Sequence, residues 1–152
     1  MSVEALRALE RAHGIAAWIA TAALFAAVWV AFRRPLRRRL GVFSAGIAAL
    51  SITLAGALGL LLEEPYRARI RQRLFVATPG LGWLFERKEH LAFGAILLGW
   101  SALFALFAAR PSAPGALSGE LFRTTKVGLA AAALFALVAS AASAIVARRA
   151  GF

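Results

Sequence analysis

The chain has 152 residues, of which 61% are hydrophobic and 16% are charged, and it contains no Cys. Soluble domains are far less apolar, so this composition excludes a soluble enzyme and a disordered chain, and the lack of Cys excludes disulfide scaffolds, Cys-ligated metals and thiol catalysis. The formal net charge of +11 does not indicate a nucleic-acid partner, because the basic residues border apolar stretches and do not form one face of a soluble module.

Four stretches without charged residues predict four transmembrane helices. These stretches cover residues 14–32, 40–62, 91–109 and 127–147. Each has about the 20 residues that a helix needs to cross a bilayer, and none alternates as a barrel strand does. We expect one all-α integral membrane domain, 1–152, folded as an up-down bundle in a bacterial-type inner membrane. Its helices are expected at about 12–32, 40–62, 89–109 and 123–147.

The connections define two sides of the membrane. We call side X the side of the N-terminus, of residues 63–90 and of the C-terminus, and side Y the side of residues 33–39 and 110–126. Side X carries ten basic and six acidic residues, and side Y eight basic and one acidic. The dense Arg cluster at 33–39 favours side Y in the cytoplasm, with the N-terminus outside. It also favours a retained first helix over a cleaved signal peptide.

The long connection on side X predicts an amphipathic helix in the membrane interface, at about 65–75. Pro65 suits a first helical position, and Tyr66, Ile70 and Leu74 fall on one stripe. Basic residues lie beside this stripe, namely Arg67, Arg69, Arg71 and Arg73. The segment Thr78-Pro79-Gly80 is expected to turn the chain, with Trp83 as an interfacial anchor.

Small residues at four-residue spacing predict close contacts between helices. One ridge comprises Ser51, Ala55 and Gly59, and a second comprises Ala136, Ser140 and Ala144. Helices associate in lipid mainly through such close approach, so the ridges favour an intimate bundle.

The only two His residues, His13 and His90, open the first and third spans. Their spacing of about half the chain indicates a duplicated two-helix hairpin. In an up-down bundle these two helices are parallel and diagonal, roughly 14 Å apart, so both rings lie at one depth. A b-type haem with two His ligands fits that geometry, with His13 and His90 on its iron.

The residues around the two His support this haem hypothesis. Ala17 and Gly94 follow the His residues by one turn and would leave room for a porphyrin. Three aromatic residues would pack on the faces of the porphyrin, namely Trp18, Phe93 and Trp100. Arg67 and Arg71 would pair with its propionates.

Other interpretations of the same residues stay open. The carboxylates Glu10, Glu63, Glu86 and Glu89 lie on side X with the His residues and would form a non-haem metal site, or with them a proton or quinone site. A His near the interface can also bond water or headgroups, with solvated Glu and Arg beside it. The chain would then be a cofactor-free accessory subunit.

With His13, His90 and four spans, the chain resembles small four-helix bacterial inner-membrane proteins of the cytochrome b-like and respiratory membrane-anchor type. The resemblance implies electron transfer beside other subunits of a membrane complex, or in a homo-oligomer. Two His allow one haem, whereas the two-haem pattern needs four. The chain lacks Asp and Asn and the Ser-x-x-x-His-Arg grouping of some anchors, which speaks against that quinone site and against independent enzymatic activity.

Overall fold

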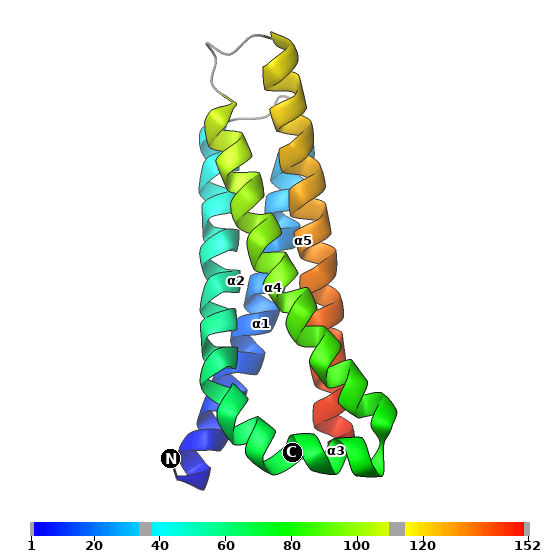
Figure 1. Cartoon of the computed structure of the whole chain (residues 1–152). Coiled ribbons are helices and arrows are strands. Elements are labelled where there is room, and N and C mark those ends of the chain that lie inside the picture. Colours follow the sequence, from blue (N-terminus) through cyan, green and yellow to red (C-terminus); the bar gives the residue numbers. More distant parts are fainter. Residues whose placement is uncertain (1, 34–37, 110–114, 151–152) are drawn as a thin grey trace.

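The computed structural model describes residues 2–33, 38–109 and 115–150, and nearly all of them are helical. The four long helices are α1 (Val3–Phe32), α2 (Arg38–Tyr66), α4 (Pro79–Ala108) and α5 (Gly115–Ala150) (Figure 1). No strand occurs in these ranges. Each of the four helices is long and apolar enough to cross a membrane. The prediction of an all-α, four-helix, multi-pass membrane protein is therefore confirmed.

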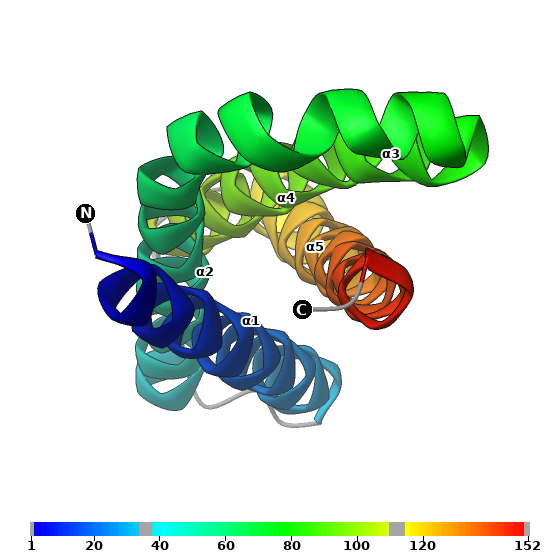
Figure 2. The same cartoon turned by 90° about the horizontal axis from the view of Figure 1, so that it is seen from below.

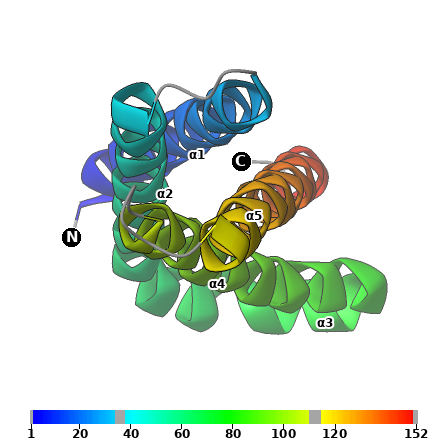
Figure 3. The same ribbon diagram turned by 90° about the horizontal axis from the view of Figure 1, so that it is seen from above.

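The four helices form a ring in the order α1, α2, α4, α5, with α5 closing back onto α1. The views along the bundle show α1 and α4 across the ring from each other (Figures 2 and 3). Both ends of the chain lie at the end that carries the connection between α2 and α4 (Figure 1). The up-down order and the diagonal placement of the first and third spans thus follow the prediction.

The helices are longer than the apolar spans that predicted them. α1 begins at Val3, about ten residues before the apolar span that predicted it. Ser2 caps this helix, because its hydroxyl accepts a hydrogen bond from the backbone N–H of Ala5 at 3.2 Å. Charged residues outside the hydrocarbon region are good helix formers, so the helices continue past the membrane boundary. The loops predicted at 33–39 and 111–115 lie largely outside the described residues.

The core of the bundle consists mostly of Ala, and the large apolar side chains point outward. Fully buried Ala side chains line all four helices, as Ala20, Ala48, Ala95 and Ala132 illustrate. Large exposed side chains include Trp29, Phe43, Leu60, Phe93 and Phe104. Small residues inside allow close helix contact, and large residues outside meet lipid.

The predicted small-residue ridges lie at helix interfaces. Ala55, Ala136 and Ser140 are buried. At Gly128 on α5 two helices also approach closely, since an added Cβ atom would lie 3.1 Å from the Cβ of Ala102 on α4. The close packing that the ridges predicted is therefore present at these positions.

The connection on side X lies across the end of the bundle as η1 (Arg67–Arg71), a π-helical turn, and α3 (Gln72–Ala77) (Figure 1). Pro65 does not start a new helix as predicted. It lies inside α2, which continues through it to Tyr66 and then into η1. Pro65 follows many helical residues, so its missing N–H removes one hydrogen bond in a helix that is already formed.

A second, smaller core holds this connection against the bundle. Leu74 of α3, Phe85 of α4 and Val146 of α5 are buried together, and the ring of Tyr66 stacks on Phe85 at a centroid distance of 4.6 Å. Tyr66 and Leu74 thus occupy the predicted apolar stripe, while the side chain of Ile70 lies outside the described residues. The chain turns at Thr78, as predicted, and α4 begins at Pro79.

Candidate functional site: the polar residues of the bundle

Polar side chains inside the spans connect α1 to both of its neighbours. Nδ1 of His13 lies 3.0 Å from the backbone oxygen of Ala55 on α2. The hydroxyls of Thr21 on α1 and Ser140 on α5 are buried and 3.2 Å apart. Each pair joins two different helices in the apolar part of the chain, where a polar group without a partner is costly.

The α2–α4 and α4–α5 interfaces also contain side-chain hydrogen bonds. Nε1 of Trp100 on α4 donates to the hydroxyl of Thr53 on α2 at 3.0 Å. The buried hydroxyl of Thr125 on α5 shares its one hydrogen between the backbone oxygen of Leu121 on its own helix, at 2.9 Å, and that of Ala102 on α4, at 3.3 Å. Every neighbouring pair of helices in the ring is therefore joined by a side-chain hydrogen bond.

His13 occupies a space that a glycine on α2 leaves open. An added Cβ atom at Gly59 would lie 3.0 Å from Cε1 of the His13 ring. The ring is thus held by a hydrogen bond to Ala55 and by contact with the next turn of the same helix. Gly59 and Ala55, which were predicted as a packing ridge, form the surface that receives His13.

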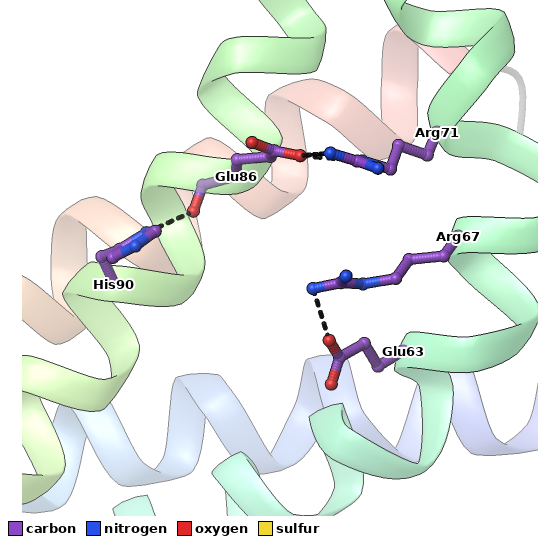
Figure 4. A network of polar contacts seen from close by, with 5 residues as sticks. All are labelled: Glu63, Arg67, Arg71, Glu86 and His90. Atoms are coloured by element: carbon purple, nitrogen blue, oxygen red, sulfur yellow. Dashed lines mark hydrogen bonds and ion pairs between the residues drawn. The ribbon is translucent and has the colours of Figure 1, made fainter.

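His90 has a different environment from His13. It is exposed, and its Nδ1 atom lies 3.0 Å from the backbone oxygen of Glu86 on its own helix (Figure 4). The interior stripe of α4 runs through Phe85, Ala95 and Gly99. Lys88, one turn after Phe85, lies on that stripe, and His90 is about 200° further around the helix. The structure therefore does not turn both His rings toward one interior space.

Lys88 is the cation that α4 presents near the interior on side X. Its Nζ atom lies 4.3 Å from the centroid of the Phe85 ring and 5.8 Å from that of Tyr66. The charge of Lys88 also acts on the ring of His13 on α1. The attraction between an ammonium group and aromatic faces stabilises its charge there. Sequence reasoning overlooked Lys88, although its spacing from Phe85 places it on the interior stripe.

The residues that were predicted to surround a porphyrin make other contacts in the structure. An added Cβ atom at Gly94 would lie 2.9 Å from the ring of Phe135 on α5, and Ala17 packs against the Ala-rich core. Trp18 and Phe93 are exposed by 49% and 63% on the outer surface. In this arrangement Gly94 and Ala17 face protein side chains, whereas Trp18 and Phe93 face outward.

Two of the carboxylates of side X, those of Glu63 and Glu86, are paired with Arg residues. Nη2 of Arg67 lies 2.6 Å from Oε1 of Glu63, and Nε of Arg71 donates to Oε1 of Glu86 at 2.8 Å (Figure 4). The second pair joins η1 to α4. Both Arg residues assigned to haem propionates therefore have carboxylate partners.

The remaining carboxylates extend this charged group. Glu89 is half-buried and lies within electrostatic range of Lys88, Glu63 and Arg67, and Glu10 on α1 lies within range of Tyr66. Over the described ranges, no three His or Glu side chains are placed to hold one metal ion. The ion pairs therefore lie across the ends of α2, η1 and α4, with Glu10 of α1 near them.

A shallow hollow of about 500 Å³ lies on the surface where α2 passes into η1. It is lined by Leu60, Glu63, Glu64, Arg67 and Ala68. All five residues belong to one continuous stretch of helix. We call this feature the α2–η1 hollow.

Comparisons of this chain with protein-family models, curated proteins and solved structures give no match.

Proposed function

We propose that the chain is a cofactor-free accessory subunit of a membrane protein complex. The observation that carries this proposal is the use of polar side chains inside the spans. His13, Thr21, Thr53 and Thr125 each make a hydrogen bond that joins neighbouring helices. Such bonds hold a bundle in one arrangement in lipid, which is what a structural subunit requires.

The α2–η1 hollow is the proposed contact site for a partner subunit. It combines the exposed apolar side chain of Leu60 with the carboxylate of Glu64, which makes no ion pair within the described part of the chain. A partner helix that ends in a Lys or Arg near the membrane boundary would match both features. Loss of a buried charge pair at an interface is costly, so Glu64 would contribute to specificity.

Copurification tests the proposal. The tagged protein, extracted from its native membrane in a mild detergent, is expected to carry a partner at a fixed stoichiometry, measured by native mass spectrometry. Glu64→Arg should release that partner, and Glu4→Arg, a matched charge reversal at another exposed position, should not. His90→Ala should also leave the complex intact. A chain that is monomeric at native expression levels, or a partner lost equally in both reversals, would contradict the proposal.

A second candidate function is binding of one b-type haem by His13 and His90, and the hydrogen bonds of both rings favour it. In each His, Nδ1 lies 3.0 Å from a backbone oxygen, of Ala55 and of Glu86 respectively. A ligating His usually donates one ring N–H to such an acceptor, which leaves Nε2 for the metal. A bound haem would supply one-electron transfer. Ligation by His90 requires α4 to turn so that this residue replaces Lys88 on the interior side.

The two candidates differ in a visible spectrum. Haem ligation predicts a b-type Soret band that is lost in His13→Ala and in His90→Ala. The accessory-subunit proposal predicts a colourless protein and no spectral change in either variant.

A further inference from the structure

The two ends of the bundle differ in net charge, since side X has six carboxylates for its ten basic residues and side Y has one for its eight. On side X, Arg67 and Arg71 form ion pairs with Glu63 and Glu86. On side Y, the described basic residues make no ion pair with a carboxylate. These side Y residues are Arg33, Arg38, Arg39, Arg123 and Lys126, and the single acidic residue of that side, Glu120, is exposed. Side Y therefore has the larger excess of positive charge, and its described basic residues have no carboxylate partner within the described ranges.

Arg38 shows this lack of partners at a single atom. Its Nη2 atom donates to the backbone oxygen of Phe107, at the end of α4, at 3.3 Å. Its Nε atom is buried and makes no hydrogen bond within the described part of the chain. Buried donors in proteins are nearly always bonded, and a guanidinium binds phosphate or carboxylate oxygens best. An acceptor from outside the described chain would satisfy this group.

Aromatic side chains fix the depth of the cations on side Y. The guanidinium of Arg33 lies 5.2 Å from the ring centroid of Trp29, and Nζ of Lys126 lies 5.5 Å from that of Phe32. Trp29 and Phe32 are both exposed on the outer surface. Trp residues at the end of an apolar span are enriched at the level of lipid headgroups. Trp29 therefore predicts that Arg33 and the neighbouring basic residues of side Y lie near the phosphate layer of the bilayer.

We propose that side Y binds the headgroups of anionic phospholipids, with a phosphate oxygen accepting from the guanidinium of Arg38. Unpaired cations at headgroup depth are attracted to anionic lipid, and the effect is worth roughly fivefold in affinity for each Lys or Arg, which corresponds to about 1 kcal/mol. This inference goes beyond the accessory role and does not depend on a partner. It also favours an orientation of the protein in which side Y lies in the leaflet that is richer in anionic lipid.

Native mass spectrometry of the full chain tests this lipid preference. The protein is exchanged into detergent micelles that contain phosphatidylglycerol or phosphatidylcholine with the same acyl chains, and retained lipids are counted. Arg38→Gln and Arg39→Gln remove cations from side Y, and Arg71→Gln removes a paired cation from side X. We expect phosphatidylglycerol to be retained preferentially and each side Y variant to weaken this retention roughly fivefold, with Arg71→Gln close to the wild type.

The possible results separate lipid binding from other causes. Equal retention of the two lipids, or equal losses in the side X and side Y variants, would overturn the proposal. Displacement of phosphatidylglycerol by millimolar inorganic phosphate would also overturn it, because the site would then be one for free anions. Arg39 is exposed, so Arg39→Gln is expected to fold even if Arg38→Gln does not, and helix content by circular dichroism checks both.

Discussion

Replacing Gly59 by Ala, with and without His13, tests whether that His is a packing residue of the α1–α2 interface. The new Cβ atom would lie 3.0 Å from Cε1 of His13, and the ring is held in place by its bond to Ala55. The ring must give way and lengthen that bond. In the His13→Ala background the same space is empty, so the Cβ atom meets no obstacle.

Gly59→Ala is expected to change the free energy of unfolding in opposite directions in the two backgrounds. Overpacking costs about 1–3 kcal/mol, and replacing Gly in a helix gains about 1 kcal/mol. Gly59→Ala should therefore lower the free energy of unfolding by about 0–2 kcal/mol in the wild type. With His13 replaced by Ala, only the helix gain of about 1 kcal/mol remains. The coupling energy between the two sites should be about 1–3 kcal/mol.

Reversible unfolding in mixed detergent micelles, followed by Trp fluorescence while the fraction of SDS is raised, measures these free energies. Gly46→Ala on the same helix is the control, because an added Cβ atom there meets nothing within 4 Å. This control reports only the stabilisation that Ala provides over Gly within a helix. If Gly59→Ala has the same effect in both backgrounds, His13 does not fill the space beside Gly59 and the packing role is refuted.

Three further changes probe other parts of the bundle. Gly128→Ala should destabilise it by about 0–2 kcal/mol, because the new Cβ atom would lie 3.1 Å from that of Ala102 and the overpacking of about 1–3 kcal/mol is reduced by a helix gain of about 1 kcal/mol; the same SDS titration measures this. Trp100→Phe removes the bond to Thr53 and should cost roughly 0.6–1.7 kcal/mol, with no further cost when Thr53 is already Val. His90→Ala should change stability by less than about 0.5 kcal/mol because the residue is exposed; a larger loss would contradict its placement.

The fold was predictable from the sequence because the bilayer imposes a strong constraint. Each apolar span must satisfy its own backbone hydrogen bonds, which leaves helices as the only option for these stretches. The ring order followed from the up-down arrangement of consecutive spans, since neighbours in sequence pack antiparallel. The ends of the helices were harder to predict, because the apolar pattern stops at the membrane boundary whereas the helices continue through the charged residues beyond it.

The rotation of each helix about its axis was the part of the site that the sequence did not reveal. The depth of His13 and His90 follows from their positions in the spans, whereas the direction of each ring depends on which stripe faces the interior. On α4 that stripe passes through Phe85 and Ala95 and includes Lys88. A stripe of small residues in an Ala-rich helix is weakly marked, so the sequence does not reveal which way the ring of His90 points.

The pairing of charges on side X was also beyond the sequence. Arg71 and Glu86 are distant in the chain and meet because η1 and α3 lie across the bundle end. The pair Arg67 and Glu63 has four-residue helical spacing, but it was predictable only once α2 was known to continue through Pro65.

The visible absorption spectrum of the full chain, expressed with a haem precursor and purified in mild detergent, tests the central claim most directly. That claim is that the polar residues inside the spans hold helices together and do not ligate a cofactor. It predicts a colourless protein whose spectrum is the same in His13→Ala and His90→Ala. A Soret band with one haem per chain, lost in both variants, would contradict it.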